Sequence, residues 1–148
     1  MKTVYISGES IQGKSYKSFI NYLLDKSDVL SYETLKMSDI VVDADDKKYY
    51  DSILRTEKIF CNFYKKKDID ERGTLKSFVY LKNSVVKDYI KRADSIYHWN
   101  YPNDIENLCF FKNDKLVFES VTHEDYFAYY PDNETEIEAL KEYGIVCY

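Results

Sequence analysis

The chain of 148 residues contains little cysteine, glycine, proline and histidine, and each shortage excludes a class of protein. Its three cysteines, Cys61, Cys109 and Cys147, are widely spaced and include no C-x-x-C pair. This pattern argues against a disulfide framework and against a zinc knuckle, and it fits a cytoplasmic protein. We expect Cys61 and Cys109 to be small buried hydrophobic residues, because each lies in an apolar run, and Cys147 to be more exposed.

Long apolar runs are also missing, so we expect no segment to span a bilayer. The first residues lack the apolar core of a secretion signal. No Gly/Ser-rich or Pro-rich linker, low-complexity tract or repeat interrupts the sequence. With 45% hydrophobic and 32% charged residues, the composition is that of a globular protein. We therefore predict a single domain over residues 1–148.

Acidic side chains outnumber basic ones, and the formal net charge of −5 disfavours binding to an extended nucleic acid. Charges of each sign nevertheless gather locally. Lys65, Lys66 and Lys67 are followed by Arg72 and Lys76, and acidic clusters occupy 39–46 and 132–142. Such runs are interpreted first as solvated faces and second as docking sites.

Hydrophobic periodicity predicts strands and helices in mixed order. Strands are expected over 2–7, 29–35, 39–42, 74–81, 108–111, 116–121 and 126–130. Helices are expected over 15–26, after Asp45 or Asp46, after Ser84, and over 133–143, where Gly144 would end the last one. The segment 58–65 fits a helix extension or a strand, and strand is favoured. The predicted fold is α+β: a mixed sheet with a late antiparallel meander and about four helices mainly on one face.

Residues Gly8 to Ser15 read Gly-Glu-Ser-Ile-Gln-Gly-Lys-Ser and match the phosphate-loop pattern G-x-x-x-x-G-K-[ST]. In such a loop the backbone amides hold phosphate oxygens, the lysine pairs with phosphate charge, and the hydroxyl binds magnesium. Lys14 and Ser15 fit the last two roles, and Asp43 is the one candidate for a further magnesium ligand. The pattern therefore indicates either a nucleotide hydrolase or a plain turn between a strand and a helix.

The rest of the sequence favours the turn. Phosphate-loop enzymes build parallel sheets from repeated strand and helix units, whereas the second half of this chain predicts antiparallel strands. In the turn interpretation, Gly13 relaxes the backbone and Ser15 caps the following helix. Asp43 belongs to a helix-start signal that explains it without a metal. This reading favours a protein without enzymatic activity.

The two histidines, His98 and His123, are the remaining chemical candidates. His123 follows a predicted strand and precedes Glu124 and Asp125, where a histidine beside carboxylates can serve as a general base. No second histidine stands at metal-ligand spacing, and neither a nucleophile-elbow serine nor a glycine-flanked cysteine is present. We interpret His123 chiefly as a corner residue held by hydrogen bonds.

Aromatic residues are abundant: sixteen tyrosines, eight phenylalanines and one tryptophan make up 17% of the chain. Tyrosine joins an apolar ring to a hydroxyl that can stay in water, which suits a contact surface. Alternation before Pro102 predicts an aromatic row on an extended segment, and a second group lies beside acidic residues. The alternative is that these rings build the core. The residues predicted to contact a partner are Tyr97, Trp99, Tyr101, Tyr126, Tyr129, Tyr130, Asp132 and Glu134.

Three motifs occur in order in the last third of the chain. They are a W-x-Y-P turn at 99–102, the strand sequence E-x-L-x-F-F-K-N at 106–113, and an S-x-x-H-E corner at 120–124. In this order they resemble a group of small proteins from low-GC Gram-positive bacteria, with a weaker similarity at 72–74. The resemblance implies a stand-alone domain of the toxin-immunity kind, and it transfers no catalytic residue.

Three functions of different classes follow. The preferred one is a cytoplasmic, non-catalytic binding protein of the immunity or inhibitor type, whose acidic, tyrosine-rich surface binds a basic effector such as a toxin or defence protein. It involves no catalytic residue, cofactor, metal or membrane. The second is a protein that sequesters a small nucleotide signal in a basic pocket. The third is a nucleotide hydrolase built on residues 8–15. The residues predicted to contact a small ligand are Lys14, Ser15, Arg72, Lys76 and His123.

Overall fold

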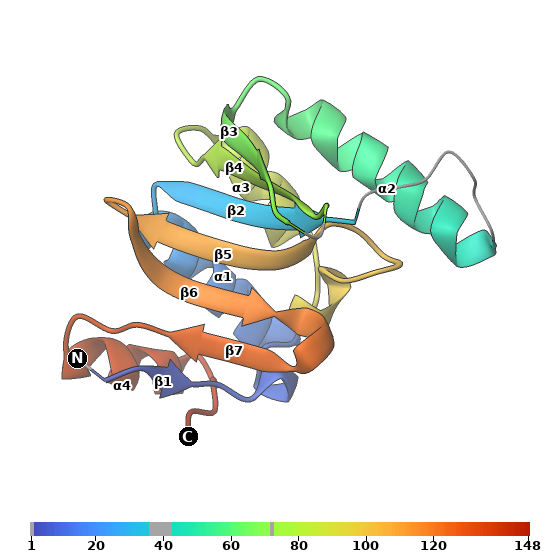
Figure 1. Ribbon diagram of the computed structural model, residues 1–148. Helices are drawn as coiled ribbons and strands as arrows, with labels where there is room; N and C mark the ends of the chain where they lie inside the picture. The colour runs from blue at the N-terminus through green and yellow to red at the C-terminus, as the bar shows by residue number, and fades with distance from the viewer. Residues whose placement is uncertain (1, 36–42, 72) are drawn as a thin grey trace.

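The described residues contribute seven strands to one antiparallel sheet, in the order β1-β7-β6-β5-β2-β4-β3 (Figure 1). The structure, a computed structural model, describes residues 2–35, 43–71 and 73–148. Strands β5, β6 and β7 form the predicted meander, and β2 lies between β5 and β4. The strands are β1 (Val4–Tyr5), β2 (Val29–Thr34), β3 (Tyr64–Ile69), β4 (Leu75–Tyr80), β5 (Glu106–Lys112), β6 (Lys115–Val121) and β7 (Tyr126–Tyr129).

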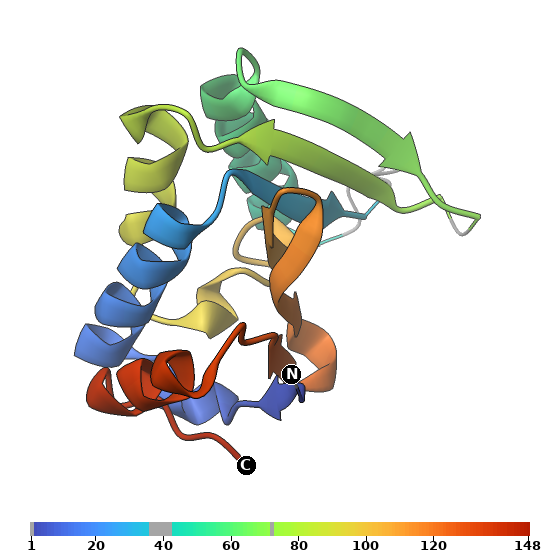
Figure 2. The ribbon, with the colours of Figure 1, turned by 90° about the vertical axis from the view of Figure 1, so that its left-hand side faces the viewer.

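Within the described ranges, four α-helices lie on one side of this sheet (Figure 2). They are α1 (Gly13–Lys26), α2 (Ala44–Phe60), α3 (Ser84–Lys91) and α4 (Glu134–Glu142), joined by short 3-10 helices η1 (Gly8–Ser10), η2 (Ile96–His98) and η3 (Thr122–Glu124). The predicted α+β class is confirmed. Every strand pairing among the described residues is antiparallel, so the expected mixed sheet contains no parallel pair there. No described helix has both the length and the apolar character that crossing a membrane requires.

The core fills the space between the helices and the sheet face beneath them. The apolar stripe of α1 is buried at the predicted helical spacing, from Tyr16 to Leu24. Aromatic rings join the two layers: Phe19 of α1 meets Phe118 of β6 edge-on at 5.2 Å between centroids, and Phe60 of α2 meets Tyr32 of β2 at 5.8 Å. Much of the aromatic content is therefore used for packing.

The helix boundaries follow capping chemistry. The Asp43 carboxylate accepts a hydrogen bond of 2.8 Å from the Asp46 amide, and the Asn133 side chain accepts one of 3.2 Å from the Glu136 amide. The first cap thus lies two or three residues before the predicted Asp45 or Asp46. Gly144 has a φ of +83°, the left-handed geometry expected where α4 ends.

The segment 58–65 differs from its prediction. Helix α2 continues through Phe60, and β3 begins only at Tyr64, so the expected strand is wrong over most of its length. The reason is tertiary, because Phe60 fills the core beneath β2. Cys61 follows the helix and is exposed, which overturns its predicted burial, whereas Cys109 is buried as expected. The predicted strand over 39–42 lies outside the described residues.

The opposite face of the sheet carries no described helix (Figure 2). Strand alternation places Leu30, Val79 and Phe110 toward the core, and their neighbours along each strand toward this second face. We call the second face the open face. The candidate partner-binding side chains described below lie on this open face.

Candidate functional site

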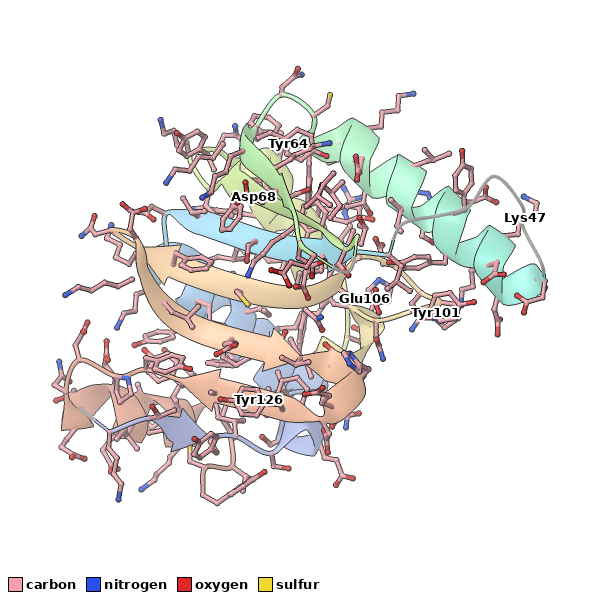
Figure 3. The ribbon with its side chains drawn as sticks, viewed as in Figure 1. Lys47, Tyr64, Asp68, Tyr101, Glu106 and Tyr126 are labelled. Atoms are coloured by element: carbon pink, nitrogen blue, oxygen red, sulfur yellow. The ribbon has the colours of Figure 1, made fainter. Side chains whose placement is uncertain are left out.

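The open face has two ends of different character. At the β3–β4 end, Lys66 and Lys76 lie over the ring of Phe78, with their ammonium nitrogens 4.7 Å and 5.7 Å from its centroid. At the β1–β7 end the side chains are tyrosines and carboxylates. Figure 3 shows Asp68 on β3 and Tyr126 on β7 at these two ends.

We call the group formed by Tyr5, Tyr126, Tyr130 and Glu119 the tyrosine edge. Tyr5 of β1 and Tyr126 of β7 meet with centroids 5.9 Å apart, and Tyr5 is 44% exposed. The hydroxyl of Tyr130 donates a hydrogen bond of 2.8 Å to Glu119. Burial and this carboxylate raise the pKa of Tyr130, so its hydroxyl stays protonated and remains a donor. The register puts all four residues on the open face, because Glu119 and Tyr5 both pair with Ala128.

The chain end adds to this group. The Tyr148 amide donates a hydrogen bond of 2.9 Å to the Tyr5 carbonyl, and Ile6 pairs with Cys147 in an antiparallel bridge. Tyr148 is 77% exposed. These last residues thereby line the outer edge of β1.

Only some of the predicted partner-binding residues lie at this surface. Tyr126 and Tyr130 do, and Asp132 and Glu134 are exposed near the start of α4. Trp99 and Tyr129 do not, because their exposed fractions are 1% and 0%. Both belong to the core, which is the alternative that the aromatic content left open.

Tyr97 and Tyr101 are half-buried, and each uses its hydroxyl within the protein. Tyr97 donates a hydrogen bond of 2.5 Å to Asp125, and Tyr101 donates one of 2.5 Å to Asp46. That hydrogen bond, with the nearby acidic charges, raises the pKa of Tyr101 to about 12. The expected extended aromatic row does not form, since 96–98 is a 3-10 helix.

The segment 8–15 forms a tight turn whose amides are already engaged. The Ser10 and Ile11 amides donate to the Ser7 and Gly8 carbonyls at 3.0 Å and 2.9 Å, and the Gly13 amide donates to the Asp94 carbonyl at 2.7 Å. A phosphate loop needs such amides to point at its ligand. Gly13 has a φ of +59°, as the turn interpretation requires.

The detail of this turn corrects one sequence-based expectation, that of a helix cap at Ser15. Helix α1 begins after Gln12, so Ser15 lies inside the helix and does not cap it. Asp43 caps α2 by accepting from Asp46. Among the described residues, no group of three or more histidine, cysteine, aspartate or glutamate side chains is arranged to hold a metal ion.

The predicted ligand-binding residues do not share one pocket. Lys14 starts α1 on the helix side, whereas Lys76 projects from the open face. His123 is exposed, with Nε2 3.7 Å from a Glu124 carboxylate oxygen, and lines a hollow of about 330 Å³ with Glu33 and Glu106. Arg72 lies outside the described residues.

A larger hollow, of about 640 Å³, lies where α2, the end of α3 and the segment 92–104 meet. Its wall includes Arg55, Arg92, His98 and Asp104. Of these, the sequence pointed only to His98, as one of two candidate histidines. The scarcity of arginine was a further feature of the sequence that could have pointed to this hollow, because the chain has three arginines against eighteen lysines. Two of the three line this hollow.

Comparisons of the chain with protein-family models, with curated proteins and with solved structures find no match.

Proposed function

We propose that this is a non-catalytic binding protein of the immunity or inhibitor type, which binds a basic protein partner with the tyrosine edge. The observation that carries this proposal is the clustering of Tyr5, Tyr126 and Tyr130 around Glu119 on a sheet face that no described helix covers. Tyrosine anchors provide contact area at a low cost in side-chain entropy.

Charge supports a basic partner. Glu119 lies within the tyrosine edge, and Glu124 and Asp125 are exposed in the corner that leads into β7. Lys66 and Lys76 occupy the far end of the same face. A basic surface would be attracted to the carboxylates near the tyrosine edge, whereas at the far end Asp68 pairs with Lys66 at 3.5 Å and leaves a mixed charge. This difference would favour one orientation of the partner on the sheet.

Rigid placement also supports binding. Tyr5 is held by the β1–β7 pairing and by the Tyr148 amide, and Tyr130 is held by Glu119. The contacts of Tyr5 fix its backbone, and the bond to Glu119 fixes the Tyr130 side chain, so less entropy is lost when the partner binds. The resemblance to bacterial proteins of the toxin-immunity kind agrees with such a role.

The test is co-expression of the protein with the product of each neighbouring gene, followed by a binding measurement on the purified pair. Double replacement Tyr5→Ala and Tyr126→Ala is expected to weaken binding at least about tenfold. The control is Tyr50→Ala, an exposed tyrosine on α2. A partner that binds wild type and the double variant equally well would contradict the proposal, as would the absence of any binding or inhibition.

A further inference from the structure

The hollow between α2 and the segment 92–104 has a polar, fully bonded floor. The buried Asp104 carboxylate accepts hydrogen bonds from Thr56 at 2.5 Å, from Tyr89 at 2.8 Å and from the Ile105 amide at 2.8 Å. The charge of Asp104 is therefore spread over three donors and is fixed in place.

The same network orders the aromatic wall. Burial and the Asp104 charge raise the pKa of Tyr89 to about 12. His98 stands edge-on against Trp99, with ring centroids 4.6 Å apart, and its Nε2 lies 3.7 Å from Asp104. The hollow thus combines aromatic side chains with a few fixed polar groups, a composition that is usual for small-molecule sites.

The rim is basic. Arg55 projects from α2 and Arg92 follows α3, and both side chains are exposed. Within the described part of the chain, neither arginine forms an ion pair. Lys48 adds a further cation, whose ammonium group donates a hydrogen bond of 2.9 Å to Asn103 at the same rim.

The acidic groups near the rim leave these arginines uncompensated. Asp94 faces solvent, with its side chain 90% exposed, and pairs with Lys17 at 3.5 Å. Asp104 is bonded within the floor. A guanidinium group presents a planar fork of donors that matches a carboxylate or phosphate, whereas lysine presents a point charge. Two of the three arginines of the chain line this one hollow, and together they offer two planar donor groups for an anion.

We propose that this hollow binds a small molecule through an oxyanion, a phosphate or a carboxylate, held between Arg55 and Arg92 with the remainder of the ligand against His98, behind which the buried Trp99 lies. The hollow has room for a ligand of nucleoside monophosphate size. The site is separate from the tyrosine edge, so it adds a ligand to the proposed partner-binding function and does not depend on it.

Trp99 gives a direct readout, because it is the one tryptophan of the chain and lines the hollow. Its fluorescence would be titrated with inorganic phosphate, adenosine monophosphate and succinate in parallel, with calorimetry as the second measurement. We expect saturable binding of at least one of these compounds. The order of their affinities shows whether the site prefers free phosphate, a nucleotide phosphate or a carboxylate. The double variant Arg55→Gln, Arg92→Gln should weaken that binding at least about tenfold.

The matched control is Lys14→Gln, which removes the phosphate-loop lysine and leaves the hollow intact. It should bind as wild type does. Absence of saturable binding for all three compounds up to about 10 mM would overturn the proposal. Loss of binding in Lys14→Gln with retention in the double arginine variant would also overturn it, and would move the site to residues 8–15. Tyr5→Ala with Tyr126→Ala should leave all three titrations unchanged.

Discussion

The indole N–H of Trp99 donates a hydrogen bond of 2.8 Å to the hydroxyl of Tyr16, which lies at the start of α1. The Tyr16 hydroxyl in turn donates to the Ile90 carbonyl at 2.7 Å. One buried oxygen therefore connects α1, α3 and the segment after η2. The hollow lined by Arg55 and Arg92 depends on that connection, because the segment that it fixes forms part of the wall of this hollow.

Tyr16→Phe should lower the free energy of unfolding by about 1–3 kcal/mol, because it leaves the Trp99 N–H and the Ile90 carbonyl without their buried partner. Urea denaturation followed by Trp99 fluorescence measures the change. Tyr50→Phe on the exposed side of α2 serves as the control and should change stability by less than about 0.5 kcal/mol. Equal stability of the two variants would show that the Tyr16 hydroxyl is replaceable by water.

Gly8→Ala tests the reason for the first glycine of the phosphate-loop pattern. A Cβ at Gly8 would lie 2.2 Å from the Tyr97 hydroxyl and 2.4 Å from the Phe127 ring, so the rings must move. We expect destabilisation of about 1–3 kcal/mol, the usual cost of overpacking. At Gly13 a Cβ would meet no atom within 4 Å, but φ is +59°, so Gly13→Ala should cost only about 1 kcal/mol. Thermal unfolding of both variants gives the comparison, and the reverse order would refute the close approach at Gly8.

Stability should fall in alkaline solution. Burial raises the pKa of Tyr64 and of Tyr89 from the ordinary value of 10 to about 12. The unfolded chain releases these protons from pH 10 upward while the folded chain keeps them, so their stabilisation is complete below pH 10 and is lost as the pH rises toward 12. Urea midpoints between about pH 9 and pH 11.5 test this, and a midpoint that rises over this range would contradict it.

The three thiols should differ in reactivity. Cys61 is exposed, whereas burial raises the pKa of the Cys109 and Cys147 thiols and lowers the fraction of reactive thiolate. A chromogenic disulfide reagent should modify one thiol per folded chain rapidly, and all three after denaturation. Cys61→Ser should abolish the rapid phase. A rapid phase that persists in this variant would mean that Cys109 or Cys147 is accessible.

Periodicity and turn chemistry were enough to predict most of the fold. The stripe of α1, the β5–β6 hairpin and the end of α4 at Gly144 all follow from local signals. Asn113 and Asp114 adopt φ values of +50° and +63° in the hairpin turn, as two-residue turns of this class require. The error at 58–65 arose because the core position of Phe60 depends on a contact with β2 that is distant in sequence.

The sites were less predictable, because they depend on which side of the sheet a residue faces. Tyr126 and Tyr129 lie three positions apart on one strand, yet the first lines the open face and the second is buried. Asp104 belongs to no recognisable sequence motif. The residues that donate hydrogen bonds to it, Thr56 and Tyr89, lie on two separate helices. Only the folded chain brings such residues together.

Strand β3 forms the outer border of the sheet, since among the described strands it pairs with β4 alone. Its exposed residues include Lys65, Lys66 and Lys67. Each of these lysines also pairs with a carboxylate, Lys65 with Asp114 at 3.1 Å, Lys66 with Asp68 at 3.5 Å and Lys67 with Glu57 at 3.2 Å. A second chain that added a strand at this border would have to displace or desolvate these charged groups, which disfavours edge-to-edge pairing.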